Sequence, residues 1–301
     1  MSVPVLLVTG FLGSGKTTFI NRLLQQDHGR RIAAIVNDFG SINIDAALLD
    51  SAADGVIGLK NGCICCSLQG DLMRTLKLVL SRRPAPELIV IEASGVADPA
   101  GITQSLMDPV IWAQARLETV IGIIDATDPA RQNDPLWLAQ LRGSDVLCLS
   151  KTAMADPSDI DRLKVALSVH GRKLMLDMDE PVPLGTLFIG DALARAHSDV
   201  PLHPDDRFCH LEWRSEQALD LQQFQTVVTR LTPNLLRAKG FVQFIGQPEA
   251  TLFQLAGNRV ALSRAPERTE TGNALVLIGE SGIFVPEAAR SALDQLLRSD
   301  P

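Results

Sequence analysis

The chain has 301 residues, with 28 Lys and Arg against 35 Asp and Glu and a formal net charge of −7. Its 46% hydrophobic residues exclude a disordered chain, which needs low hydrophobicity and high net charge. No part is strongly basic and no apolar run reaches the roughly 18 residues of a membrane span, so we expect neither a nucleic-acid nor a membrane partner. The N-terminus shows no export signal. The chain has five cysteines, an odd number that does not suit a framework of disulfide bonds, so we expect a cytoplasmic protein with reduced thiols.

The N-terminal part of the chain alternates short apolar runs with amphipathic stretches. The runs predict buried strands over residues 5–9, 32–36, 87–92, 119–125 and 146–149. Apolar residues at helical spacing predict helices over residues 16–26, 68–80 and 160–169. The apolar stretch 102–112 is interpreted as either a core helix or a partner surface. Continuous apolar strands separated by helices predict an α/β fold with a mostly parallel sheet covered on both faces.

The pattern changes after a polar segment with two prolines, residues 198–206, which we interpret as a linker. Beyond it we predict strands over residues 208–213, 241–245, 251–255, 260–262 and 274–278, and helices over residues 219–231 and 286–297. Clustered strands with flanking helices are typical of a small α+β domain. The predicted organisation is therefore a first domain over residues 1–197, the linker, and a second domain over residues 207–301.

A phosphate-binding motif lies at the start of the chain. Residues 10–17, Gly-Phe-Leu-Gly-Ser-Gly-Lys-Thr, follow a predicted strand, open a predicted helix and match the Walker A pattern. In such a loop backbone N–H groups converge on the β-phosphate, and the helix N-terminus adds positive potential. Lys16 would pair with the β- and γ-phosphates, and Thr17 would hold Mg²⁺. The candidate nucleotide ligands here are Gly10, Gly13, Ser14, Gly15, Lys16, Thr17 and Thr18.

Two acids at the ends of predicted strands are candidates for the same site. Glu92 would order the water ligands of Mg²⁺. The N–H of Gly95 would donate to a γ-phosphate, and the loss of this contact on hydrolysis would act as a switch. Asp38 would approach Mg²⁺ or a transition metal, or would belong to an ordinary turn, because Asn, Asp and Gly favour turns. Lys16, Glu92 and Asp38 are thus the candidate catalytic residues, with Asp38 or Glu92 orienting the attacking water.

Three cysteines crowd into four positions at Cys63, Cys65 and Cys66, just before a predicted helix. Thiolates near a helix N-terminus have a depressed pKa and bind soft or borderline metals such as Zn²⁺. A further ligand must come from elsewhere, with Asp38, a histidine or water as candidates. A redox-sensing dithiol is the alternative.

The order of these motifs resembles that of the CobW family of P-loop GTPases, relatives of the nickel-insertion GTPases. The resemblance rests on the Walker A loop, Asn-Asp-Phe-Gly at 37–40, Gly-Cys-Ile-Cys-Cys at 62–66 and Glu-Ala-Ser-Gly-Val-Ala-Asp-Pro at 92–99. Leu-Leu-Arg-Ala-Lys-Gly at 235–240 resembles a signature of the family's C-terminal domain.

The resemblance implies a metal-responsive GTPase that hydrolyses GTP with Mg²⁺ and hands Zn²⁺ or Co²⁺ to a client metalloprotein. It implies that Cys63, Cys65 and Cys66 form the metal loop and that Asp38 contributes near it. Metal bound at the cysteine loop and γ-phosphate bound near Gly95 would both favour one of two conformations of the same part of the chain. Each ligand would therefore change the affinity of the protein for the other. A homodimer is a separate candidate for the state of the chain.

The chain departs from the family in the segment that reads the base. The family's Asn-Lys-x-Asp is replaced here by Ser150-Lys151-Thr152-Ala153, which keeps the Lys and loses the Asp that accepts from guanine. Asp156, three residues on, is a candidate replacement. Ser150 and Lys151 remain candidate nucleotide ligands. The alternatives are a degenerate GTPase that acts as a metal-sensing scaffold and an enzyme that uses ATP.

Overall fold

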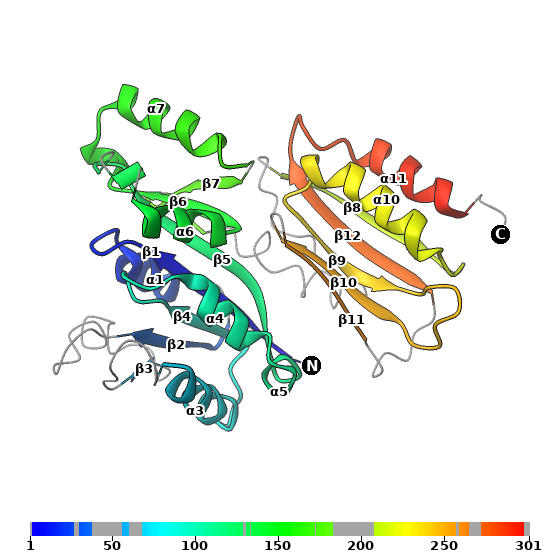
Figure 1. Cartoon of the computed structure of the whole chain (residues 1–301), viewed down its shortest axis with the longest axis horizontal. Coiled ribbons are helices and arrows are strands. Elements are labelled where there is room, and N and C mark those ends of the chain that lie inside the picture. Colours follow the sequence, from blue (N-terminus) through cyan, green and yellow to red (C-terminus); the bar gives the residue numbers. More distant parts are fainter. Residues whose placement is uncertain are drawn as a thin grey trace. The chain divides into compact units, whose positions relative to one another are not determined.

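The computed structural model describes residues 2–26, 30–37, 56–59, 68–128, 131–132, 134–171, 173–182, 208–256, 259–264 and 272–297. The chain forms two compact units, Met1–Val182 and Pro183–Pro301 (Figure 1). The predicted linker at 198–206 lies outside the described residues and stays a prediction.

The first unit is built on a seven-stranded sheet in the order β3-β2-β4-β1-β5-β6-β7, in which every neighbouring pair is parallel. This confirms the predicted α/β fold. The strands are β1 (Val3–Gly10), β2 (Ile32–Asn37), β3 (Val56–Leu59), β4 (Leu88–Glu92), β5 (Ala115–Asp125), β6 (Val146–Ser150) and β7 (Leu174–Asp177). The edge strands β3 and β7 were not predicted, because four residues are too few for an apolar run to stand out.

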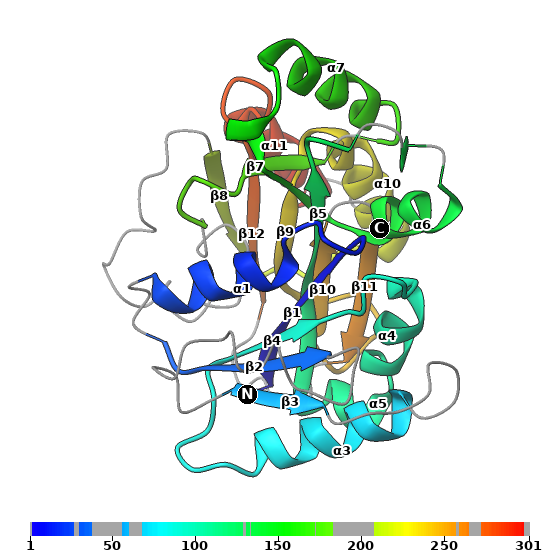
Figure 2. The same ribbon diagram turned by 90° about the vertical axis from the view of Figure 1, so that its left-hand side faces the viewer.

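The helices of this unit pack on both faces of the sheet. They are α1 (Lys16–Gln25), α3 (Leu68–Leu80), α4 (Pro99–Leu106), α5 (Pro109–Trp112), α6 (Pro135–Gly143) and α7 (Pro157–Ser168). Figure 2 shows α1 against β1 and β4, and α3 beside β3. Leu106 and Ile111 are buried in the sheet's core cluster, so residues 102–112 contain core helices, although Met107 and Val110 are exposed.

Four of these helices, α4, α5, α6 and α7, begin with the same dipeptide, Asp followed by Pro. Each Asp carboxylate accepts a hydrogen bond from the backbone N–H two residues on, at Asp98, Asp108, Asp134 and Asp156. Proline fits the first helical position because its missing N–H is not needed there. The predicted helix 160–169 therefore starts earlier, at Pro157.

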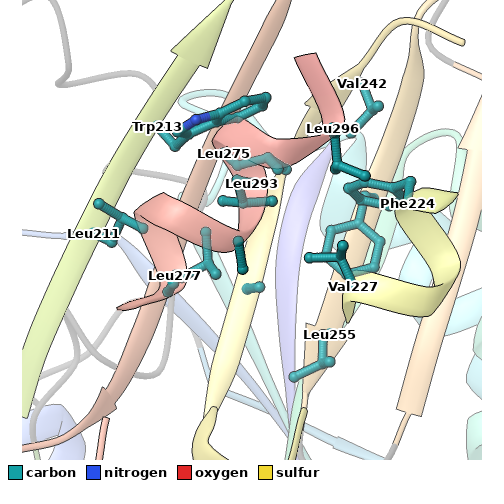
Figure 3. Packing of buried hydrophobic residues seen from close by; sticks show 14 of the residues in the cluster. Leu211, Trp213, Phe224, Val227, Val242, Leu255, Leu275, Leu277, Leu293 and Leu296 are labelled. Carbon is teal, nitrogen blue, oxygen red and sulfur yellow. The ribbon is translucent and has the colours of Figure 1, made fainter. Parts of the chain in front are cut away.

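The second unit is a five-stranded antiparallel sheet in the order β11-β10-β9-β12-β8. Its strands are β8 (Phe208–Ser215), β9 (Arg237–Val242), β10 (Thr251–Ala256), β11 (Arg259–Arg264) and β12 (Asn273–Glu280), and its helices are α10 (Leu221–Leu231) and α11 (Pro286–Asp294). Both helices lie on one face of the sheet, where Phe224 of α10 and Leu293 of α11 meet Leu275 of β12 in one core cluster (Figure 3).

One strand of this unit is displaced from its predicted place. The strand predicted at 241–245 is β9 at Arg237–Val242. It contains Arg237 and Lys239, whose exposed fractions are only 3% and 8%. Two buried basic residues on alternate positions broke the apolar run by which a strand is recognised.

Candidate functional site

The phosphate loop connects β1 to α1 at the carboxyl edge of the parallel sheet, where ligands of such folds bind. Gly10, Gly13 and Gly15 have φ of 143°, 74° and 97°, a range that favours glycine. A Cβ on Gly10 would lie 2.5 Å from the backbone O of Ile123. The glycines of the motif are therefore required by the shape of the loop itself.

Lys16 lies over this loop. Its side chain is buried, with 7% exposed, and Nζ donates to the carbonyl oxygens of Gly10 and Phe11 at 3.1 Å each. The buried Oγ of Ser14 has no hydrogen-bond partner in the part of the chain that the structure describes. The loop thus offers a fixed ammonium group and an unused hydroxyl to an anionic ligand.

Thr17 and Glu92 meet although 75 positions separate them in the sequence. The Thr17 hydroxyl donates to Oε1 and Oε2 of Glu92 at 3.1 and 3.3 Å. Glu92 ends β4, which pairs with β1, and only 5% of it is exposed. A hydroxyl and a carboxylate side by side are hard oxygen donors, so the pair fits Mg²⁺.

The segment after β4 lies directly against the phosphate loop. A Cβ on Gly95 would lie 2.8 Å from the N of Leu12 and 2.9 Å from its Cα. Gln140 of α6, which is 2% exposed, donates from Nε2 to the carbonyl oxygens of Gly95 and Ala97 at 3.2 and 3.1 Å. The sequence analysis missed Gln140, because a single glutamine in a helix carries no signal.

Ser150 and Lys151 lie at the carboxyl end of β6, on the side where a base would bind. The Ser150 hydroxyl donates to the Ser14 carbonyl at 2.6 Å and to the Ile124 carbonyl at 3.3 Å, so Ser150 ties β6 to the phosphate loop. Lys151 adopts a left-handed backbone with φ of 57°, and its ammonium group pairs with Asp125. Burial raises the pKa of Asp125, but hydrogen bonds from Lys151 and Thr127 outweigh it and hold this pKa below its usual value.

The segment that would accept from the base lies after β6. Ala153, where the family's acidic acceptor is missing, lies exposed in a short 3₁₀ helix. Asp156, the proposed replacement, caps α7 by accepting from the Ser158 N–H at 2.9 Å. A third acid lies here that the sequence analysis missed: Asp177, at the end of β7, accepts from the Thr152 hydroxyl at 3.1 Å.

The predicted metal residues Cys63, Cys65, Cys66 and Asp38 lie outside the described residues. Within the described part there is no group of three or more His, Cys, Asp and Glu that could hold a metal ion. Cys148 is buried in β6, and burial raises its pKa to about 12. No described helix is both long and apolar enough to cross a membrane.

Two family models match the chain, one in each unit. A model for the CobW/HypB/UreG nucleotide-binding domain matches residues 4–174, and one for the cobalamin synthesis protein cobW C-terminal domain matches residues 208–297. The chain is 30% identical to the zinc chaperone CobW of Pseudomonas aeruginosa, over 85% of this chain and 81% of that protein.

Two further similarities concern one bacterial relative. The chain is 29% identical to the zinc chaperone YjiA of Escherichia coli, over 84% of this chain and 85% of that protein. The crystal structure of the Zn(II)-bound YjiA GTPase from that bacterium aligns with a TM-score of 0.49 at 24% identity, over 98% of this chain and 99% of that one. The family matches cover both units of the fold, and the chain belongs to the CobW/HypB/UreG family.

Proposed function

We propose that this chain is a Mg²⁺-dependent GTPase that binds Zn²⁺ and delivers it to a client metalloprotein. The observation that carries the nucleotide part is the meeting of Lys16, Thr17 and Glu92 at the phosphate loop. The metal part is supported by the Cys-x-Cys-Cys motif at 63–66 and by the zinc-chaperone names of the relatives. Co²⁺ is the second candidate metal. Closely spaced reduced thiols suit the cytoplasm.

Phosphate binding would follow from groups already in place. The positive φ values of the loop glycines suit a loop whose backbone N–H groups would face one anion, and the Lys16 ammonium group would pair with its β- and γ-oxygens. Thr17 and Glu92 would hold Mg²⁺, directly or through water. When bound, Mg²⁺ supplies positive charge that offsets the charge developing on the transferred phosphoryl group.

Hydrolysis would depend on positioning more than on covalent chemistry. The N–H of Gly95 is held near the phosphate loop by the close approach to Leu12 and by Gln140. Asp38 or Glu92 would orient the attacking water. We expect slow turnover, because the described residues include no dedicated base beside the loop apart from Glu92, whose oxygens already accept from Thr17.

Zn²⁺ would be the cargo of the cysteine loop, with Cys63, Cys65 and Cys66 as thiolate ligands and Asp38 as an oxygen ligand. Asp38 directly follows β2 in the sequence and Glu92 ends β4, and these two strands are neighbours in the sheet. The cysteines follow β3, which pairs with β2. A γ-phosphate and a metal ion would then bias the same connecting segments, and each would change the affinity for the other.

The test measures phosphate release and zinc stoichiometry on the full-length protein. We expect Mg²⁺-dependent GTP hydrolysis that Lys16→Ala abolishes, and one Zn²⁺ per chain that Cys63→Ser, Cys65→Ser or Cys66→Ser weakens. Cys209→Ser is the matched control, because Cys209 belongs to the other unit, where its thiol contacts the carbonyl oxygens of Phe284 at 3.4 Å and Gly279 at 3.8 Å. Hydrolysis that survives Lys16→Ala, or zinc binding unaffected by the three serine variants, would contradict the proposal.

One observation favours a second candidate function. Ala153 has no acceptor for guanine, which suits a scaffold that binds nucleotide weakly or an enzyme that uses ATP. Equal hydrolysis of GTP and ATP would favour the ATP-using enzyme. Zinc binding without hydrolysis of either nucleotide would favour the scaffold, and a reversible disulfide without zinc would favour a redox sensor.

A further inference from the structure

A carboxylate, that of Asp177, lies beside the segment Ser150–Ala153, in which the family's acidic acceptor for guanine is replaced by Ala153. β7 runs parallel to β6 with Leu149 opposite Asp177, and the Met178 N–H donates to the Leu149 carbonyl at 2.8 Å. The Thr152 hydroxyl donates to Oδ1 of Asp177 at 3.1 Å. Thr152 directly precedes Ala153, so Asp177 brings a negative charge from the neighbouring strand to this segment.

The same strand end adjoins the phosphate loop. A Cβ on Gly15 would contact the Met178 side chain at 3.4 Å and the Cβ of Ser150 at 3.7 Å. Ser150 is itself bonded to the loop through Ser14. A nucleotide with its phosphates on this loop and its base along the stem of Lys151 therefore extends toward the carboxyl ends of β6 and β7.

The Asp177 carboxylate is oriented and still has room for a ligand. Its Oδ1 accepts from the Thr152 hydroxyl and from the Asp179 N–H at 2.9 Å, which fixes the direction of the group. Its Oδ2 has no hydrogen-bond partner within the described part of the chain, and the side chain is half-buried. A carboxylate oxygen accepts up to two hydrogen bonds, so Oδ2 suits a ligand that presents N–H donors.

The other acids of this edge are already engaged. Asp125 pairs with Lys151, Asp156 caps α7, and Asp179 accepts from Arg22 Nη1 at 2.7 Å. Among these four acids, Asp156 and Asp179 are exposed and Asp125 is paired with a lysine, whereas Asp177 is half-buried, is oriented by two hydrogen bonds to Oδ1 and pairs with no cation in the described part of the chain. We propose that Asp177 is the specificity-determining residue that accepts from N1–H and the N2 amine of guanine, in place of the acid missing at position 153. This inference rests on the proposed GTPase function.

The chemistry predicts selection against adenine as well as for guanine. Guanine presents two adjacent N–H donors to a carboxylate, at N1 and N2. Adenine presents a lone pair at N1 and has no amine at position 2, so a carboxylate facing that edge would be repelled. A lost hydrogen bond to a charged acceptor lowers affinity by roughly tenfold to a hundredfold.

The test exchanges the hydrogen-bonding pattern at Asp177 and measures GTP, ATP and XTP affinity by calorimetry with Mg²⁺ on the full-length protein. The amide of Asp177→Asn can accept from N1–H of xanthine and donate to its O2. We expect wild type to prefer GTP to ATP at least tenfold. We expect Asp177→Asn to lose tenfold to a hundredfold in GTP affinity and to gain in XTP affinity, and Asp177→Ala to lose GTP affinity without that gain.

Asp179→Asn is the matched control, because it changes a neighbouring exposed carboxylate, and we expect it to leave the order of base preference unchanged. An Asp177→Asn variant that keeps wild-type affinities for GTP and XTP would overturn the inference. So would an Asp156→Asn variant that loses affinity for GTP and gains affinity for XTP. Wild-type protein that binds GTP and ATP equally well would overturn it while leaving phosphate binding intact. Wild-type protein that binds no nucleotide would refute the proposed function too.

Discussion

Gly95→Ala tests whether the segment after β4 must lie against the phosphate loop for hydrolysis. The added Cβ would lie 2.8 Å from the N of Leu12 and 2.9 Å from its Cα, whereas ordinary van der Waals contact begins at 3.4 Å. Both neighbours are backbone atoms, so a rotamer change cannot relieve the contact. The two segments must separate by about 0.6 Å, the difference between 3.4 and 2.8 Å.

Forcing a methyl group into such a contact costs about 1–3 kcal/mol. The N–H of Gly95 would meet the γ-phosphate, so we expect the cost to fall on the GTP-bound state and on its transition state. The predicted loss in turnover is then about 5- to 150-fold. Binding of GDP, which has no γ-phosphate, should change much less than binding of a non-hydrolysable GTP analogue.

The assay compares steady-state phosphate release and the affinities for GDP and for the analogue between two alanine variants. The control is Gly101→Ala, six residues on in α4, where an added Cβ meets nothing within 4 Å. Alanine should stabilise that helix by about 0.5–1 kcal/mol and leave hydrolysis unchanged. If Gly95→Ala hydrolyses GTP as fast as Gly101→Ala, the reasoning from this close approach is refuted.

Three other predictions concern single side chains. Ser150→Ala should leave the buried Ser14 carbonyl without its 2.6 Å bond and weaken GTP binding by about 1–3 kcal/mol by calorimetry; an effect no larger than that of the exposed Ser168→Ala would contradict this. Because the Cys148 pKa is about 12, alkylation at pH 8 mapped by mass spectrometry should leave Cys148 unmodified until the protein is denatured; rapid native labelling would show otherwise. Trp213→Phe removes the 2.8 Å bond to Asp294 and should lower the free energy of unfolding in urea by about 2–4 kcal/mol with unchanged GTP binding; a loss below about 0.5 kcal/mol would contradict this burial argument.

Local patterns predicted much of the first unit. The glycines and Lys16 occur in a motif whose spacing is dictated by loop geometry, and the strand that precedes it is an unbroken apolar run. The helix Leu68–Leu80 was predicted with its observed ends, because its apolar residues repeat at helical spacing. The meeting of Thr17 with Glu92 could be anticipated only because parallel neighbours place their carboxyl ends at one edge.

Contacts that depend on tertiary packing were beyond a single sequence. Gln140 and Asp177 act through hydrogen bonds to segments 45 and 25 residues away, and nothing in their own neighbourhoods marks them. Asp156 looked available for the base because it is close in sequence to Ala153, but the Asp-Pro start of α7 uses its carboxylate as a cap. The strand β9 was predicted several residues too late in the sequence, because the buried Arg237 and Lys239 interrupt its apolar pattern.

The central claim is that nucleotide state and zinc binding are coupled in one protein. The most direct measurement is the affinity for Zn²⁺ with GDP and with a non-hydrolysable GTP analogue bound, in wild type and in Cys65→Ser. The account predicts that the analogue and GDP change zinc affinity by different factors, about 5- to 150-fold apart, and that Cys65→Ser weakens zinc binding in both nucleotide states. Equal zinc affinities in the two nucleotide states would contradict the account.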